Sequence, residues 1–567
     1  MKFSSRFKGF AVLCIALTAF AALTAVAVAV GPFSPPDRSA DLASEINPDK
    51  PKNVILLIGD GTDEQIITAA RNYEKGAAGR FALDDLPFVG DMTTYGLKVG
   101  PGPQYPIEYV SDSAPTASAW STGHKTVDGR LSQGPSGSAS VPGTDYQTVL
   151  EQFAADGRRT GDVSTAEVTD ATPAAAASHI NIRTCQGPTD MTPCTAARKS
   201  NGGKGSIAEQ LVDNKVDVIL GGGLNRFNQA TDAGPTVLSY AQNAHGYNYL
   251  NDKTQLSAVT SLDNGPVLGL FTAGNMTPRY SPLVATTPPG TGSTTTKCSL
   301  ANRGSEPTLA DMTHKAIELL DNDKGFFLQV ESALIDKAEH NADICGAMGE
   351  VDELDDALKV ALDYYASNPD TLIVITGDHA HSTQIVPNNS AGRQTATVET
   401  ADGDPMYVAY STQATGASHT GATVRVAAIG PQAANITGLI DETDLYSTLV
   451  GHNPSKLSTG PTGPAGANGT NGTNGSNGKN GATGIVVRCR SLGRKRATCR
   501  IPKSLLKTVK IGRRTSAKAV RNGKTVGRGS VFPSGRAIFH STGARLPIRG
   551  TLTLVVGGRR LRAEFAG

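Results

Sequence analysis

The sequence predicts an α/β protein whose large, mostly parallel central sheet is flanked by helices and followed by a Gly-rich linker and a small basic β module. Between about residues 51 and 452, short apolar runs alternate with longer segments of helical periodicity, the pattern of a parallel sheet covered on both faces. After residue 460 the composition changes twice, first to a glycine repeat and then to a strongly basic segment. With 567 residues, the chain is long enough for one large domain and at least one small one.

The first 30 residues have the features of a secretory signal peptide. A basic start is followed by an uninterrupted apolar run that ends in small residues. We therefore expect export to the periplasm, the cell surface or the medium. Because the apolar run is about 20 residues long, an uncleaved membrane anchor is the alternative. Residues 31–50 are polar and contain prolines, which predicts a linker.

The cysteines fit an oxidising compartment. Cys14 lies in the signal segment, and six others remain in the rest of the chain. Their even number favours disulfides, and none has the Cys-x-x-Cys spacing of a thiolate zinc site. We expect two short loops and one longer loop, closed by Cys185 with Cys194, Cys489 with Cys499, and Cys298 with Cys345.

Five apolar runs rich in Val, Ile and Leu predict buried strands at residues 53–59, 216–223, 325–331, 371–378 and 424–430. Two segments between these strands have the apolar spacing of amphipathic helices, residues 307–323 and 350–367. The alternation predicts one large catalytic domain over residues 51–454.

A glycine repeat follows this domain. Glycine recurs at every third position from Gly460 to Gly484, nine times in all. This is the period of collagen, but only two prolines supply the stiffness that a triple helix needs. We therefore predict a flexible low-complexity linker over residues 455–484.

The segment 485–567 differs from the rest of the chain in charge. It carries 21 Lys or Arg residues and one acid, Glu564, so its net charge is near +20. Because the whole chain has a net charge of +2, the remainder is near −18. Short β-like runs and Gly-rich turns predict a small, disulfide-closed β module here.

Three of the predicted strands end in residues that a buried strand would not otherwise contain. The first stops at Asp60, the third ends in Glu331, and the fourth leads into Asp378, His379 and His381. Ligands of open α/β sheets bind at the carboxyl ends of the strands, so we expect these endings to share one crevice. A single Gly-Asp after a strand is more often a turn or helix cap, but three such endings favour a site.

A second group of ligand-type residues follows Glu331. Asp336 and His340 are four residues apart, which places both on one face of a helix, and His419 lies in a Gly-rich loop. Carboxylate and imidazole ligands suit Zn²⁺, whereas an all-oxygen set with Asp60, Glu331 and a threonine suits Mg²⁺. An exposed acid and a surface histidine are the alternative for the helix pair. Two divalent cations roughly 4 Å apart are a standard device of phosphoryl transfer.

Ser113, in "VSDSAPTASAW", is a candidate nucleophile without a nearby histidine. It has no G-x-S-x-G motif, so a Ser-His-Asp mechanism is unsupported. Coordination to Zn²⁺ would lower the pKa of its hydroxyl and supply the alkoxide. We expect it at the start of a helix, where backbone N–H groups favour an anionic oxygen; a helix cap alone is the alternative.

Residues 50–452 resemble the bacterial alkaline phosphatases. The motifs that carry the resemblance are, in chain order, "NVILLIGDG", "SDSAPTASAWSTG", "STAEVTDATPAAAASHINIRTC", "KGFFLQVESALIDKAEH", "VITGDHAHSTQIV" and "SHTGATVRVAAIGP". The resemblance implies hydrolysis of phosphate monoesters through a covalent phosphoserine, with two Zn²⁺ ions and one Mg²⁺ ion. It also implies a homodimer.

The resemblance further implies roles for individual residues. Ser113 is expected as the nucleophile, with Asp112 as its positioning neighbour, and Arg183 as the group that grips two phosphate oxygens. His381 is expected to orient a metal ligand, and Lys337 to contact phosphate through water. The implied metal ligands are Asp336, His340 and His419 for one zinc, Asp60, Asp378 and His379 for the other, and Asp60, Thr172 and Glu331 for magnesium, whose waters Asp170 holds.

Two other functions compete with this interpretation. One is a phosphodiesterase or sulfatase of the same superfamily, although Arg183 and the complete magnesium set argue for a dianionic monoester. The other is a surface-binding protein whose basic tail docks on anionic cell-surface polymers, with a solubilising or structural β module as the alternative for the tail. Nucleic-acid binding is not predicted for the catalytic domain.

Overall fold

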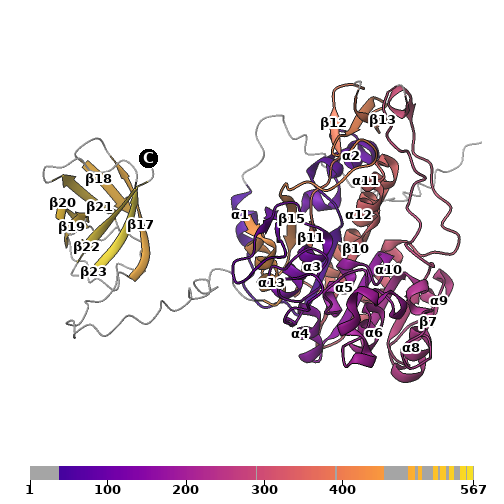
Figure 1. The fold of residues 1–567 in the computed structure, drawn as a ribbon. Helices are drawn as coiled ribbons and strands as arrows, with labels where there is room; N and C mark the ends of the chain where they lie inside the picture. The colour runs from indigo at the N-terminus through magenta and orange to yellow at the C-terminus, as the bar shows by residue number, and fades with distance from the viewer. Residues whose placement is uncertain are drawn as a thin grey trace, which may run out of the picture. The chain divides into compact units, whose positions relative to one another are not determined.

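The computed structural model describes residues 38–288, 290–389 and 392–451, together with seven strands between residues 483 and 565 (Figure 1). The chain divides into two compact units, Met1–Gly460 and Pro461–Gly567, and each is described by itself. The predicted signal peptide lies outside the described residues, and so does all but the end of the predicted Gly-rich linker. Within the described part of the chain, no helix is long and apolar enough to cross a membrane.

A ten-stranded sheet forms the centre of the first unit, and it confirms the predicted large, mostly parallel sheet. Only the neighbour pairs made by β15 are antiparallel; β15 runs opposite to both β2 and β11. In spatial order the strands are β16 (Gly438–Asp441), β2 (Phe88–Thr93), β15 (Val424–Ile429), β11 (Thr371–Gly377), β1 (Asn53–Gly59), β10 (Phe326–Ser332), β5 (Arg159–Glu167), β6 (Val218–Gly222), β8 (Val267–Leu270) and β7 (Asn248–Leu250).

Helices cover both faces of this sheet (Figure 1). Successive residues of β1 enter two different cores, because side chains alternate across a strand: Ile55 and Leu57 lie in one, and Leu56 and Ile58 in the other. The first core also contains residues of α2 (Glu64–Lys75), α10 (Leu309–Leu320), α11 (Leu334–His340) and α12 (Ile344–Ser367). The second contains residues of α3 (Ser113–Thr122), α4 (Val149–Ala155), α5 (Ala171–Ala177), α6 (Ile207–Asp213), α8 (Val237–His245) and α13 (Glu442–Leu449).

Both predicted helices are present, with shifted ends. The segment 307–323 contains α10, and the segment 350–367 forms the second part of α12, which begins six residues earlier at Ile344. The earlier start follows from Asp343, whose side chain caps the helix by accepting from the backbone N–H of Gly346. The predicted linker 31–50 contains a short helix, α1 (Ser39–Ser44).

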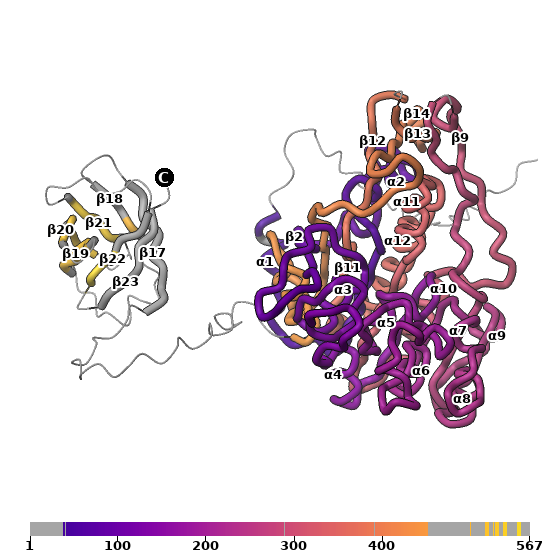
Figure 2. The backbone as a smooth tube through the Cα atoms, viewed as in Figure 1, coloured from indigo at the N-terminus to yellow at the C-terminus, as the bar shows by residue number. Residues whose placement is uncertain are grey.

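A small second sheet interrupts the chain between two predicted site residues. Its order is β12 (Gln384–Val386), β14 (Pro405–Tyr410), β13 (Gln394–Glu399) and β9 (Thr295–Thr296), and Figure 2 shows it beside α2. Three of its strands, β12, β13 and β14, lie between His381 and His419 in the chain, whereas β9 comes from an earlier segment. The remaining short elements are β3 (Gly96–Leu97), β4 (Ile107–Glu108), α7 (Leu224–Phe227), α9 (Lys253–Ala258) and six 3₁₀ turns within the described ranges.

The second unit is a closed barrel, which agrees with the predicted β-rich C-terminal segment. The first unit contains two of the predicted disulfides, which join Cys185 to Cys194 and Cys298 to Cys345. In the barrel Cys499 is disulfide-bonded, and the strand register places Cys489 opposite it. The strand order is β17 (Thr483–Ser491), β18 (Arg496–Arg500), β21 (Arg536–Ser541), β20 (Lys524–Val531), β19 (Thr515–Arg521), β22 (Gly550–Val556) and β23 (Arg559–Phe565).

Candidate metal centre

Adjacent parallel strands bring the predicted acids to one edge of the sheet. The register pairs Ile58 of β1 with Glu331 of β10, and Gly59 of β1 with Gly377 of β11. Asp60 and Asp378, which follow β1 and β11 directly, therefore lie next to Glu331. The backbone N–H of Gly61 donates to Asp378 Oδ1 at 2.8 Å and joins the two strand ends.

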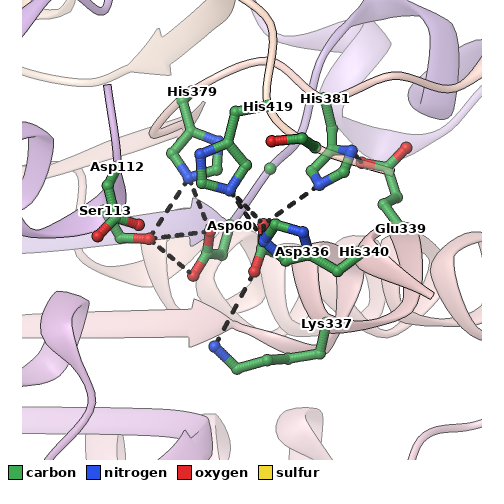
Figure 3. A network of polar contacts seen from close by, with 12 residues as sticks. Asp60, Asp112, Ser113, Asp336, Lys337, Glu339, His340, His379, His381 and His419 are labelled. Carbon is green, nitrogen blue, oxygen red and sulfur yellow. Dashed lines mark hydrogen bonds and ion pairs between the residues drawn. The ribbon is translucent and has the colours of Figure 1, made fainter. Parts of the chain in front are cut away.

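Asp336 is the centre of a first cluster of ligand-type atoms (Figure 3). Its Oδ1 lies 3.1 Å from His419 Nε2 and 3.3 Å from His340 Nε2, and the two Nε2 atoms are 3.0 Å apart. Asp336 and His340 both belong to α11, on one face as their spacing predicts. His381 is the fourth member, with Nε2 3.6 Å from Asp336 Oδ1.

The backbone orients two of these rings. His340 Nδ1 lies 3.0 Å from the carbonyl oxygen of Ala417, and His419 Nδ1 lies 3.2 Å from that of Ser111. A carbonyl can only accept, so each Nδ1 carries the proton and donates it. With Nδ1 as the donor to a carbonyl, each Nε2 is the nitrogen that would coordinate a metal bound beside Asp336.

A second cluster adjoins the first. His379 Nε2 lies 3.4 Å from Asp60 Oδ1 and 3.3 Å from Asp378 Oδ2. The rings of His379 and His419 are stacked with centroids 3.8 Å apart, so the two clusters are in direct contact (Figure 3). Asp60, Asp378 and His379 are all buried, which keeps their charges away from bulk water.

An oxygen-only group lies on the other side of Asp60. Glu331 accepts a hydrogen bond from the hydroxyl of Ser164 on β5, and burial is the main cause that raises its pKa to about 7. Thr172 lies in the first turn of α5, and its buried hydroxyl is near enough to Glu331 to lower the pKa of that carboxyl, although it makes no hydrogen bond of ordinary geometry among the described residues. A buried hydroxyl without a partner is costly unless a ligand satisfies it.

Ser113, the predicted nucleophile, lies at the second cluster of ligand-type atoms. It is the first residue of α3, after Asp112 at the N-cap position, and is 3% exposed. Its Oγ lies 3.4 Å from Asp60 Oδ1 and 3.4 Å from His379 Nε2. The hydroxyl is therefore held at the metal-type cluster and also at a helix start.

Two cations and two acids form a chain of ion pairs beside Ser113. Arg183 donates from Nη1 to Asp112 Oδ2 at 2.7 Å and from Nη2 to Asp170 Oδ1 at 2.6 Å. Lys337 Nζ lies 2.9 Å from the other oxygen of Asp170. Burial alone would raise the pKa of Asp170, but Lys337 and Arg183 outweigh it and hold that pKa well below its usual range.

The acids of the crevice exceed the cations that face them. Burial is the main cause that raises the pKa of Asp60 well above its ordinary value, and repulsion by Asp378, Asp336 and Glu331 adds to it. Divalent cations would offset this repulsion, and the unpartnered Thr172 hydroxyl would complete an oxygen site. The donor set thus fits zinc at the two His/Asp clusters and magnesium at the oxygen group.

Sequence reasoning missed Ser164, Glu339 and Thr383. The Glu339 side chain is buried, accepts a short hydrogen bond from Thr383, and has an oxygen 3.9 Å from His381 Nδ1. Glu339 directly precedes His340 on α11. A glutamate in a helix is usually exposed, so the sequence alone predicts an exposed position for it. The signal that could have found it is its i, i+3 spacing from Asp336, which places both near one helix face.

Comparisons with known proteins identify the family. The family model of alkaline phosphatase matches residues 51–415, which include every predicted metal ligand except His419. The alkaline phosphatase of Escherichia coli (strain K12) is 43% identical over 73% of this chain and 88% of that protein. The streptomycin-6-phosphate phosphatase of Streptomyces griseus is also 43% identical, over 70% and 89% respectively. A solved alkaline phosphatase from a psychrophilic Shewanella sp. aligns with a TM-score of 0.53 at 24% identity, covering 70% of this chain and 98% of that one, which shows a shared fold.

Proposed function

Because the chain belongs to the alkaline phosphatase family, we propose that it hydrolyses phosphate monoesters through a covalent phosphoserine on Ser113. The observation that carries the proposal is the position of Ser113 Oγ, 3.4 Å from both Asp60 Oδ1 and His379 Nε2. Ser113 directly follows Asp112, which anchors Arg183, so the hydroxyl has the metal-type cluster and the phosphate-binding arginine in its surroundings. Attack on phosphorus requires that juxtaposition.

We propose two zinc ions and one magnesium ion as the resident metals. When bound, they would lower the pKa of the serine hydroxyl and of water and offset the charge of the phosphate. Asp170 would hold the magnesium through water. The proposed ligands are Asp336, His340 and His419 for the first zinc, Asp60, Asp378 and His379 for the second, and Asp60, Thr172 and Glu331 for magnesium.

The residues of the chain then have distinct tasks. Ser113 Oγ forms a bond to phosphorus while the bond from phosphorus to the oxygen of the alcohol breaks. Water cleaves the resulting serine phosphate, which releases inorganic phosphate and restores the hydroxyl. Arg183 holds two phosphate oxygens with its planar fork, and Lys337 adds a positive charge through water. His381 and Glu339 orient Asp336 and the adjacent rings.

The experiment that tests the substrate class compares p-nitrophenyl phosphate with bis-p-nitrophenyl phosphate and p-nitrophenyl sulfate. We expect the monoester to have the highest kcat/KM, because the three proposed metal cations and Arg183 would offset the charge of a dianion. The Streptomyces relative is itself named for a phosphate monoester. A preference for the diester or the sulfate would replace the proposal with one of the two alternatives from the same superfamily.

Export remains a proposal that the disulfides support. Two of them close in the first unit, and structural disulfides persist in oxidising compartments. A homodimer likewise remains an expectation from the resemblance.

A further inference from the structure

The barrel of the second unit carries a row of basic residues across four neighbouring strands. Lys518 of β19 stands opposite Arg528 of β20, Arg528 opposite His540 of β21, and His540 opposite Arg496 of β18. Directly opposite residues of an antiparallel pair occupy the same face, so the four positions, here called the basic row, lie on one face. With strands about 4.8 Å apart, the basic row spans about 14 Å.

Three positions of the basic row lie on the outside of the barrel. Lys518, Arg528 and His540 are exposed. Ala519, next to Lys518, is 1% exposed, and Phe539, next to His540, is also 1% exposed. Because side chains alternate across a strand, the buried neighbours fill the interior, whereas Lys518, Arg528 and His540 face solvent; Arg496 belongs to the row by its register.

The basic row is unfavourable for the barrel by itself. Like charges directly opposite each other on a sheet destabilise it. The segment 485–567 contains one acid, Glu564, and β23 places it opposite Thr551 and Arg488, away from the row. Within the described part of the chain, Lys518 and Arg528 have no ion-pair partner. A barrel selected for stability or solubility alone would interleave acids here, so the arrangement points to an anionic ligand.

We propose that the basic row binds a linear phosphodiester polymer of the cell envelope, of the poly(glycerol phosphate) type. A line of basic residues over four strands, three of them Lys or Arg, matches a chain of repeated anions better than a single small anion. Fifteen of the 21 cations in residues 485–567 are arginines, whose fork matches phosphate oxygens. The net charge of the rest of the chain is near −18, so the attraction to such a polymer comes from the barrel.

The aromatic residues of the segment favour this polymer over nucleic acid. Residues 485–567 contain three phenylalanines and neither Tyr nor Trp. Phe539 is buried and presents no ring to solvent, and among the described positions of the basic row His540 supplies the one exposed ring. Proteins that bind single-stranded nucleic acid stack its bases on exposed aromatic rings. The basic row combines positive charge with a single imidazole ring, and the segment has neither Tyr nor Trp for stacking, which suits a polymer without bases.

The test uses the full chain and immobilised poly(glycerol phosphate), with binding measured between 25 and 300 mM NaCl, a range of about one decade that resolves the slope. The variant is Lys518→Glu with Arg528→Glu, and Lys518→Gln with Arg528→Gln is a milder form. The control is Arg521→Glu with Lys524→Glu, which changes the same two residue types by the same charge at the hairpin end of the same strands. Hydrolysis of p-nitrophenyl phosphate, from the other unit, checks that each variant is intact.

We expect the wild-type affinity to fall with salt at a log–log slope of about −2.1, because the three Lys or Arg positions of the row each contribute about 0.7 and histidine is counted as neutral at pH 7. The row variants should bind at least about tenfold more weakly at low salt with a slope near −0.7, whereas the control should change by less than about threefold. Phosphatase activity should be equal in all variants.

Four results would overturn the inference. Equal weakening in the row variants and the control would show attraction to net charge without a defined face. Tighter binding to polygalacturonate, or to single-stranded DNA, would identify a carboxylate polymer or a nucleic acid as the ligand. Salt-sensitive self-association that excludes the polymer would show that the barrel pairs with the acidic unit of this chain or of a second copy.

Discussion

Replacing Arg183 with alanine should reduce kcat/KM for p-nitrophenyl phosphate by about 10²- to 10⁴-fold. The guanidinium has five N–H groups, and the structure engages one with Asp112 and one with Asp170, at 2.7 and 2.6 Å. These two pairs fix the side chain and leave three N–H groups for a ligand. Two charge-assisted hydrogen bonds to phosphate contribute about 1.5–3 kcal/mol each, which gives about 3–6 kcal/mol for the transition state.

Two further variants separate the loss of the arginine fork from a general effect of removing a guanidinium. Arg183→Lys keeps the charge but loses the fork, so it should recover about half of the free energy and lose only about 10- to 100-fold. Arg226→Ala is the matched control, because Arg226 also bridges two acids, Glu167 and Asp190, at 2.9 and 3.0 Å, outside the site. The assay is steady-state kinetics at saturating zinc and magnesium. If Arg183→Ala keeps kcat/KM within about threefold of the wild type, the phosphate-binding role is wrong.

The remaining predictions concern the metals and the scaffold. Chelation should abolish monoester hydrolysis, and zinc with magnesium should restore more activity than either ion alone; an active metal-free protein would contradict the assignment. Burial would lower the pKa of His179, but the hydrogen bond to Glu151 at 2.8 Å outweighs burial and raises the pKa of His179 above 6.5. Burial would raise the pKa of Glu151, but the hydrogen bond with His179 outweighs burial and lowers the pKa of Glu151 below 4.5. The pair therefore stabilises the fold most between about pH 4.5 and 6.5, and less as the pH rises through the raised pKa of His179. Glu151→Gln should lower the free energy of unfolding, measured with denaturant, by about 1–2 kcal/mol at pH 6 and by less at pH 9. An equal loss at both pH values would refute the charged pair. Removing the Cys298–Cys345 disulfide, with its sequence separation of 47, should lower the free energy of unfolding by about 4 kcal/mol, against about 2.5 kcal/mol for Cys185–Cys194, whose separation is 9. A larger loss from the shorter loop would contradict an entropic origin of the stabilisation.

Much of the sheet could be predicted because its central strands are continuous apolar runs. The strand β5 (Arg159–Glu167) was missed because its sequence, "RTGDVSTAE", is polar although most of the strand is buried. Its polar groups find partners inside the protein: Asp162 accepts from Gln329, and Ser164 donates to Glu331. Apolar periodicity cannot detect a strand whose burial depends on such tertiary hydrogen bonds. The reversed direction of β15 is likewise not encoded in its composition.

The candidate site was predictable where it follows from strand ends and helix spacing. Asp60, Glu331 and Asp378 converge because their strands are parallel neighbours, and Asp336 meets His340 because both lie on α11. The sequence does not contain the ion-pair chain through Arg183, which joins residues 71 positions apart along the chain. Such a contact depends on how loops approach in space, and only the resemblance to a family suggested the role of the arginine.

The central claim is that Ser113 carries the phosphate during turnover. The most direct measurement is acid quenching of the enzyme during hydrolysis of a phosphate monoester, followed by proteolysis and mass spectrometry of the peptide that contains Ser113. We expect one phosphate on that peptide in the wild type and none in Ser113→Ala, which should keep only slow residual hydrolysis. Phosphate on another residue, or wild-type turnover by Ser113→Ala, would contradict the account.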